Sequence, residues 1–543
     1  AEKLAENLND EDKEKFKEAF VDKIETMYGI SIEESTNVDK YIALSTLVKE
    51  YIYRNWVQTH RKYDEENAKQ MYYFSIEFLP GKQLGTNLLN LGITDICKEG
   101  LKDLEIELRS LEAIENDAGL GNGGLGRLGS CFLESLASSN YAGHGCTIRY
   151  DYGLFKQKII DGEQVELLDN WLEYGNIWEI RKPNKSVEVK FNGNVRTEHI
   201  DGYTRFIHEN YDTVLAVPHD MPVIGYKNDT VNTLRLFSPE TKSDIDFTLL
   251  SGEDTKRALE YETSVKEISQ SLYPDDTSYE GKVLRLKQQY FLVSAGLQTV
   301  VKRFIRKGGD IRNLHKDVAI HINDTHPSLT VPELMRLLID EYHLGWDEAW
   351  SIVTKTLSYT NHTIMPEALE KWNVSMLKQL LPRVYMIIEE IDRRFNIELD
   401  EKYGNDESRK NELRIISFDQ IHMANLAIVG SHSVNGVAKV HSEILKDKVM
   451  KPFYDLYPEK FNNKTNGITH RTWLLKSNPS LSKIITDAIG DEWITKPNKL
   501  KNILEFKDDS VFREKIMESK KENKILLDQV LNDRYGISID TNS

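Results

Sequence analysis

The spacing of apolar residues along this chain of 543 residues changes several times, and each change indicates a different kind of element. Apolar side chains that recur every three or four residues are typical of amphipathic helices. Before residue 147 this spacing predicts helices over 10–28, 39–61, 101–115 and 125–139. Residues 71–76, by contrast, form a continuous apolar run that predicts a buried β-strand.

Between residues 147 and 279 the pattern favours strands, followed by a short helix. β-Branched and aromatic residues are frequent in 147–158, and short strands are expected to continue over 185–237. Asp161-Gly162 suits a two-residue type I′ turn and predicts a hairpin. The helical pattern of 264–273 ends at the polar segment 274–279, which we expect either to cover a site or to form an ordinary solvated turn.

Strands and helices alternate again in the second half of the chain, which predicts an α/β architecture. The run 318–322 is a short apolar strand, helical spacing follows over 331–340 and 346–357, and a further helix is expected to begin near Pro366. The rest comprises a charged helical stretch, a segment of small residues suited to close helix packing, a polar hinge and a charged amphipathic stretch: 382–415, 421–442, 464–473 and 497–535.

A glycine-rich segment precedes the helix predicted at 125–139, and five glycines lie between Gly119 and Gly126. Glycines let a ligand approach bare backbone, and a helix N-terminus offers unpaired N–H groups to an anion, most often phosphate. The segment fits G-x-G-x-x-G, but the residues before it are helical, which argues against a nicotinamide dinucleotide. A turn that only packs the helix closely is the alternative.

Four ionisable side chains lie at turns that follow or lead into predicted elements: Glu77, Asp324, His326 and His362. Open α/β sheets bind their ligands at the carboxyl ends of strands, so these side chains are candidates for one site. A salt bridge of Glu77 with Lys82 and a structural role for each histidine are the alternatives. Metal binding is disfavoured because no short H-x-H or H-x-x-x-H pair occurs.

Composition limits the classes of partner. The net charge of −17 disfavours nucleic acid and anionic membranes, and no apolar run is long enough to span a bilayer. The first residues lack the apolar core of a signal peptide. The three cysteines are odd in number and not in metal-binding spacing, which favours free thiols in a reducing cytoplasm.

Several segments resemble the glycogen/starch (α-glucan) phosphorylase family, and the likeness extends over nearly the whole chain. The matching segments are 117–128, 169–176, 284–291, 323–327, 359–369, 432–441 and 464–473. The resemblance implies an α/β fold: the Rossmann-like N-terminal domain of a two-domain GT-B glycosyltransferase, with β-rich insertions and a truncated second domain. It also implies pyridoxal 5′-phosphate as cofactor, and phosphorolysis of an α-1,4-linked terminal glucose to glucose 1-phosphate.

The resemblance also assigns roles to individual residues. The catalytic group is implied to be His362, Asp324 and Asn466, of which His362 and Asn466 hold glucosyl hydroxyls. The substrate-binding group comprises Gly124, Leu125, Asp276, Thr277, His326 and Glu77, and Asp276 and Thr277 belong to a loop that gates the pocket. The cofactor is implied to lie against Gly123, Gly124 and Trp473. No metal ligand is implied.

The end of the chain departs from the family pattern. We expect the N-terminal phosphorylase domain over 1–465 and only the beginning of a second Rossmann-like domain over 466–543, which is shorter than the ~150 residues that such a domain needs. The family's cofactor lysine and its phosphate-binding cations have no counterpart here. The chain alone is therefore expected to be inactive.

Partners follow from the same resemblance, and two other functions stay open. Expected partners are glycogen or maltodextrin, inorganic phosphate, a second copy of the chain paired through a protruding helix at 255–275, and a separate C-terminal fragment. Instead of contributing to an enzyme, the chain could be a module that only binds glucan or dimerises. A weaker alternative is a glycoside hydrolase that uses Glu77 and Asp324 as paired carboxylates.

Overall fold

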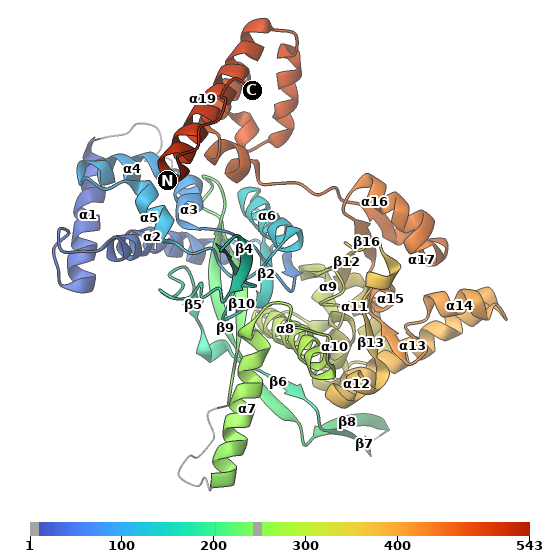
Figure 1. Cartoon of the computed structure of the whole chain (residues 1–543). Helices are drawn as coiled ribbons and strands as arrows, with labels where there is room; N and C mark the ends of the chain where they lie inside the picture. The colour runs from blue at the N-terminus through green and yellow to red at the C-terminus, as the bar shows by residue number, and fades with distance from the viewer. Residues whose placement is uncertain (1–9, 201, 243–251) are drawn as a thin grey trace. The chain divides into compact units, whose positions relative to one another are not determined.

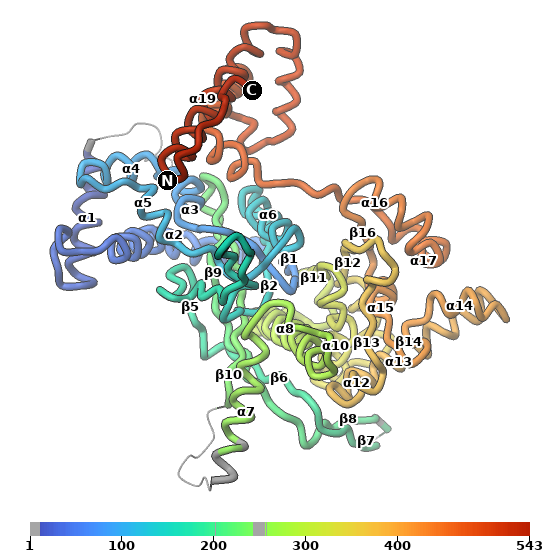
Figure 2. Tube along the Cα trace, in the orientation of Figure 1, coloured from blue at the N-terminus to red at the C-terminus, as the bar shows by residue number. Residues whose placement is uncertain are grey.

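The computed structural model describes residues 10–200, 202–242 and 252–543. The chain divides into two compact units, 1–467 and 468–543, whose colours in Figure 2 run from blue to orange and from orange to red. Each unit is described by itself below.

The first unit is built on a ten-stranded sheet, counted within the described residues (Figure 1). The strand order is β17-β16-β12-β11-β1-β2-β10-β9-β5, and β6 pairs with β9. All pairs from β17 to β10 are parallel, whereas β9 runs antiparallel to β10, β5 and β6. The strands are β1 (Gln70–Phe74), β2 (Gly143–Ile148), β5 (Ile180–Arg181), β6 (Val187–Phe191), β9 (Asp212–Ile224), β10 (Val231–Glu240), β11 (Val318–Asn323), β12 (Leu357–Thr360), β16 (Ser433–Gly436) and β17 (Phe461–Asn463).

Smaller strands and the helices surround this sheet. The small strands are β3 (Lys156–Ile160), β4 (Glu163–Leu167), β7 (Asn194–Ile200), β8 (Tyr203–Glu209), β13 (Lys371–Asn373), β14 (Ile416–Ser417) and β15 (Gln420–His422). The helices of the first unit are α1 (Asp10–Tyr28), α2 (Asn37–Glu65), α3 (Leu84–Leu91), α4 (Thr94–Asp103), α5 (Leu108–Ile114), α6 (Gly124–Ser138), α7 (Gly252–Gln270), α8 (Tyr279–Arg306), α9 (Leu314–Asp317), α10 (Thr330–Arg336), α11 (Trp346–Thr356), α12 (Val374–Leu380), α13 (Pro382–Tyr403), α14 (Glu407–Leu413), α15 (Met423–Gly430), α16 (Lys439–Ile444) and α17 (Lys451–Leu456). The second unit contains α18 (Pro479–Ile489) and α19 (Ser510–Tyr535).

The central strands are parallel because their sequences can be buried on both faces. Every residue of β2 is buried, and the apolar residues of β1 and β11 lie in the main core. Helix α8 packs against β1, where a Cβ added at Gly296 would lie 2.6 Å from the Phe74 ring. Since residues 288–301 are all buried, α8 is the central helix of this core.

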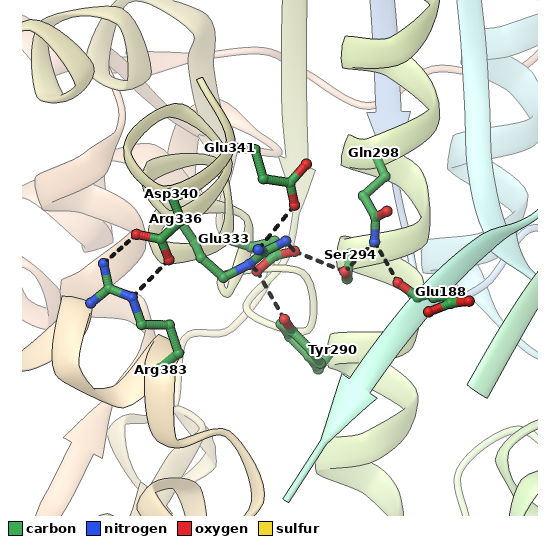
Figure 3. A network of polar contacts seen from close by, with 9 residues as sticks. All are labelled: Glu188, Tyr290, Ser294, Gln298, Glu333, Arg336, Asp340, Glu341 and Arg383. Atoms are coloured by element: carbon green, nitrogen blue, oxygen red, sulfur yellow. Dashed lines mark hydrogen bonds and ion pairs between the residues drawn. The ribbon is translucent and has the colours of Figure 1, made fainter. Parts of the chain in front are cut away.

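A charged network joins α8 to α10 inside the core (Figure 3). Glu333, which has no exposed surface, accepts hydrogen bonds from Tyr290 (2.9 Å) and Ser294 (2.8 Å) of α8. The Arg336 guanidinium donates to both oxygens of the same carboxylate, at 2.8 and 2.9 Å. Beside it, Arg383 of α13 forms a two-hydrogen-bond pair with Asp340.

Most of the elements expected from the pattern are present. The α/β class, the helices at 10–28 and 39–61 and the strands at 71–76 and 318–322 are confirmed within a few residues. The hairpin is confirmed too: Asp161 and Gly162 have φ of 52° and 84°, as a type I′ turn requires.

Two expectations about helices were wrong, and a third was correct except for its bounds. The stretch 101–115 is the end of α4, a break and α5, because Glu105 adopts a left-handed φ of 59° between them. The helix near Pro366 is a three-residue 3₁₀ turn followed by β13, and α12 begins only at Val374. The helix expected at 264–273 and, as a dimer element, at 255–275 is α7, which runs from Gly252 and ends at Gln270.

The small-residue segment 421–442 contains the expected close helix packing together with a strand that the pattern did not indicate. A Cβ added at Gly430 of α15 would lie 2.5 Å from Val331 of α10. The unexpected strand is β16.

None of the helices in the described ranges combines the length and the apolarity needed to cross a membrane. Cys97, Cys131 and Cys146 are all unpaired thiols and all buried.

Candidate functional site

The turns after β11 and β12 lie side by side because the two strands are parallel neighbours in register. Asn323 pairs with Thr360 at the end of this ladder. The next residue, Asp324, adopts a left-handed φ of 61°, and its backbone N–H donates to the Thr360 carbonyl at 2.9 Å. Asp324 also accepts a hydrogen bond from the N–H of Thr325, which is how an aspartate stabilises such a conformation. The structure therefore brings the Asp324 turn next to the turn that carries His362.

A buried amide connects these turns to β1. The Asn323 side chain has no exposed surface, and its Oδ1 accepts from the Tyr73 hydroxyl (2.8 Å) and from Nε2 of His362 (2.7 Å). Its Nδ2 donates to the Ser75 hydroxyl at 3.0 Å. Sequence reasoning missed Asn323, Tyr73 and Ser75, because polar residues in or just after a strand give no sign of which distant strand they face.

Glu77 lies in the same region and holds the glycine-rich loop. Its Oε2 accepts from the backbone N–H groups of Asn122 (2.6 Å) and Gly123 (3.4 Å), and its Oε1 accepts from the Tyr273 hydroxyl at 3.0 Å. The suggested salt bridge with Lys82 is not formed, because the Lys82 ammonium donates to backbone carbonyls of α5 instead. A buried carboxylate thus occupies part of the anion-binding loop.

The remainder of that loop is available to a ligand. Within the described residues no acceptor is found for the N–H groups of Gly124 and Leu125, which open α6. A Cβ added at Gly123 or Gly124 would meet open space, whereas one at Gly121 would lie 2.6 Å from the Phe78 carbonyl oxygen. Two free donors at the positive end of the α6 dipole, beside open space, suit an anionic oxygen.

Tyr273 connects the two parts of the site. Its hydroxyl donates to Glu77, and its ring lies 6.0 Å from the His326 ring, measured between centroids. Tyr273 has a positive φ of 52°, which is uncommon for an aromatic residue and places it at the start of the expected gating segment.

The gating segment is held by a chain of charges. Asp276 accepts a hydrogen bond from Arg285 at 2.6 Å, and Arg285 also reaches Glu370 at 3.4 Å. Glu370 accepts a further bond from Gln289 at 2.8 Å. Thr277 is exposed, and its backbone N–H donates to the Asp275 carboxylate at 3.0 Å. The segment therefore has one charged anchor at Asp276 and is solvent-exposed around it.

Burial determines the protonation of the strand-end side chains. Desolvation lowers the pKa of His362 to about 4 and also lowers the pKa of His326, so both imidazoles are neutral at pH 7. Desolvation raises the pKa of Asp324, although His326 opposes the shift. Nδ1 of His326 is enclosed and has no hydrogen-bond partner among the described residues. The two neutral imidazoles suit a hydroxyl-bearing ligand.

Comparison with known proteins identifies the family. The model of the family described as carbohydrate phosphorylase matches residues 101–543. This chain belongs to the carbohydrate phosphorylase family. The parallel sheet and the α/β order agree with the two-domain GT-B fold expected for that family.

Individual relatives of the phosphorylase family cover nearly all of this chain. Glycogen phosphorylase from Bacillus subtilis is 49% identical over 531 residues, which are 98% of this chain and 66% of the relative. The brain and liver forms of human glycogen phosphorylase are each 43% identical over 520 residues, or 94% of this chain and 61% of each relative. The chain therefore spans somewhat less than two thirds of the length of these relatives.

The remaining two candidate site residues are Asn466, near the end of the first unit, and Trp473, in the second unit. The Asn466 N–H donates to the Val437 carbonyl just after β16, and its side chain is exposed. Trp473 belongs to the second unit, and about half of its side chain is exposed. In the described part of the chain, no group of three His, Cys, Asp or Glu side chains is arranged to hold a metal ion.

Proposed function

We propose that this chain supplies the glucosyl-binding half of an α-1,4-glucan phosphorylase active site. The reaction transfers a terminal glucosyl unit of glycogen or maltodextrin to inorganic phosphate and gives glucose 1-phosphate. One observation carries this proposal. In a chain of the phosphorylase family, a neutral His362 held by Asn323 lies beside Asp324 at the ends of two parallel strands, and an anion-binding loop begins at Gly124.

The sugar-binding role follows from the chemistry of the groups. Glucosyl hydroxyls both donate and accept hydrogen bonds, so neutral imidazole and amide groups can bind them without the cost of desolvating a charge. We assign His362 and Asn466 to these hydroxyls, with Asp324, His326 and Glu77 around the same pocket. Because His362 is held by Asn323, it enters the reaction already oriented.

The phosphate-binding role is assigned to the start of α6. The open space beside Gly123 and Gly124 and the free N–H groups of Gly124 and Leu125 fit a phosphate oxygen. These residues would hold the phosphate of pyridoxal 5′-phosphate or of the substrate, and Trp473 is proposed to pack near the cofactor. When bound, that cofactor supplies a phosphate group for acid–base chemistry beside the substrate phosphate.

The loop of Asp276 and Thr277 is proposed to close over the glucosyl pocket. Its single charged anchor to Arg285 lets it move without disturbing the buried core. Closure would exclude water, which matters because water would otherwise compete with phosphate for an oxocarbenium-like glucosyl group.

The test uses two proteins. One is the 543-residue chain, and the other is the same chain joined to the part of the Bacillus subtilis relative that it does not cover. The proposal implies that the cofactor lysine lies in the part of the relative that this chain does not cover. We therefore expect glucose 1-phosphate from maltodextrin and phosphate with the joined protein and none with the chain alone. Free glucose formed equally well without phosphate would instead support the hydrolase alternative, with Glu77 and Asp324 as its carboxylates.

A non-catalytic glucan-binding module is the second candidate, because the neutral imidazoles of His362 and His326 suit glucan hydroxyls whether or not a reaction follows. It predicts that the chain alone binds maltoheptaose in calorimetry, without any product. Binding that is unaffected by His362→Ala would place the glucan elsewhere on the chain.

We also propose a homodimer that forms through α7 in the reducing cytoplasm. The helix extends away from the sheet in Figure 1, and it is joined to the first unit by buried residues near its C-terminal end, including Val265 and Ile268. Leu259, farther along the extension, is 58% exposed and would be covered by a twin helix. Light scattering that shows only monomers of the joined protein at micromolar concentration would count against this dimer.

A further inference from the structure

The hydrogen bonds around Asn323 fix which way its amide points. The Ser75 hydroxyl donates its hydrogen to the carbonyl of Glu77 at 2.8 Å, and a carbonyl can only accept. The Ser75 oxygen must therefore accept the bond of 3.0 Å that joins it to Asn323, so the amide atom facing Ser75 is the nitrogen. The amide oxygen consequently faces Tyr73 and His362.

This orientation determines the tautomer of His362. An amide oxygen cannot donate, so Nε2 of His362, 2.7 Å away, must carry the hydrogen. A neutral imidazole has one N–H, which leaves Nδ1 with a lone pair. Burial keeps the pKa of His362 near 4, so the ring does not gain a second proton at neutral pH.

The lone pair of Nδ1 is available. Among the residues that the structure describes, Nδ1 has no hydrogen-bond partner, and it is not one of the side-chain atoms enclosed from solvent. The titratable groups that act on the ring are His326, His441 and Glu77, and His321 lies close enough for the two rings to affect each other.

We propose that Asn323 is a positioning residue that locks His362 as the Nε2–H tautomer, so that Nδ1 accepts a hydrogen bond from a ligand hydroxyl. The identity of that ligand as a glucosyl unit rests on the function proposed above, whereas the tautomer does not. The site then requires a hydroxyl at the contacted position and rejects an analogue with fluorine or an ether oxygen there, because two acceptors would face each other.

The tautomer can be measured without any activity assay. The full 543-residue chain is labelled with ¹⁵N-histidine, and solid-state NMR spectra are compared with those of His362→Gln to assign the ring. At pH 7 we expect a protonated Nε2 and an unprotonated Nδ1. A protonated Nδ1 in the wild-type chain would overturn the proposal, whether or not any variant folds.

Two substitutions at Asn323 and one control separate positioning from general packing. Asn323→Ala removes the acceptor, so a mixture of both tautomers is expected. Asn323→Asp keeps an acceptor of the same shape but adds a negative charge, so His362 should hold both protons up to a distinctly higher pH. Tyr73→Phe removes the other donor and should leave the Nε2–H tautomer unchanged.

A folded Asn323→Ala chain with unaltered His362 signals would refute the role of Asn323, as would an Asn323→Asp chain with an unshifted titration. A failure of the proposed function has a different signature. In that case the tautomer is as expected, but maltoheptaose leaves the Nδ1 signal unchanged and the joined protein forms no glucose 1-phosphate.

Discussion

Two buried polar networks in the first unit differ in their charge and in whether they leave an acceptor open. The network around Glu333 in Figure 3 is charged, and the carboxylate at its centre is fully used by Tyr290, Ser294 and Arg336. The network around Asn323 is neutral and closed except for one atom, Nδ1 of His362. The first arrangement can only stabilise the fold, whereas the second can also bind a ligand. Under the function proposed above, the position of this open acceptor distinguishes a ligand-binding network from a structural one.

The largest effect is expected where the closed network is opened. Glu333→Ala leaves the Arg336 guanidinium, whose side chain is only 18% exposed, without its main partner, so the free energy of unfolding should fall by ~3–5 kcal/mol. Urea unfolding of the chain measures this loss. Glu341→Ala is the matched control, because that carboxylate is about 43% exposed on the same arginine and should change stability little. Equal losses for the two variants would contradict the assignment.

The open network should respond in activity rather than in stability. In the joined protein, His362→Ala should lower kcat by ~10²–10³, which corresponds to ~2–4 kcal/mol, with little change in the KM for phosphate. The proposed function makes this contact strongest in the transition state and assigns phosphate binding to donors in α6. Steady-state kinetics and a thermal scan distinguish the cases. Near-normal kcat with a much lower unfolding temperature would make His362 a packing residue.

The neighbouring His321 should make the stability of the first unit depend on pH. Burial lowers the pKa of His321 to about 4. Its two ring nitrogens form hydrogen bonds with the hydroxyls of Ser358 and Thr360. Since the unfolded chain takes up this proton near pH 6.5, the stabilisation is complete above that pH and is lost progressively as the pH falls towards 4. At about pH 4 we expect the free energy of unfolding to have fallen by roughly 2–3 kcal/mol because of this histidine. His321→Gln should flatten that part of the stability–pH curve, and an unchanged curve would show that His321 is not its source.

The smallest effect is expected at the gating segment, which belongs to neither network. The pair between Asp276 and Arg285 is partly exposed, so Asp276→Ala should cost only ~0.2–1 kcal/mol, and less at high salt. Urea unfolding at two salt concentrations tests this. Arg285→Ala is the contrasting variant, because it also deprives the buried Glu370 of its cation and should cost clearly more.

The sequence indicated the fold class well, because the periods of the core strands and long helices are strong signals. It failed where local backbone conformation overrides period. Glu105 adopts a left-handed conformation between α4 and α5. Leucines of both helices pack into the same core, so the spacing of apolar residues does not reveal the break. Pro366 begins only a 3₁₀ turn, because β13 follows within a few residues and leaves no room for a longer helix.

The candidate site was only partly accessible from sequence. Their positions at turns beside predicted strands and helices pointed to Glu77, Asp324 and His362, whose contacts are now described, although their roles stay proposals. Asn323 was missed because its function comes from parallel pairing with distant strands. Its partner Tyr73 lies 250 positions earlier, and no local pattern encodes such a pairing.

That pairing also imposes a delay during synthesis. Strand β1 lies between β2 and β11, so the edge of β1 that receives β11 has no complete partner until the ribosome has reached Asn323, 250 positions after Tyr73. At bacterial to eukaryotic elongation rates this takes about 12–50 s. An apolar strand edge left open for that long is a template for aggregation. The nascent chain is therefore most exposed to misassembly, and most in need of a chaperone, between the emergence of β1 and that of β11.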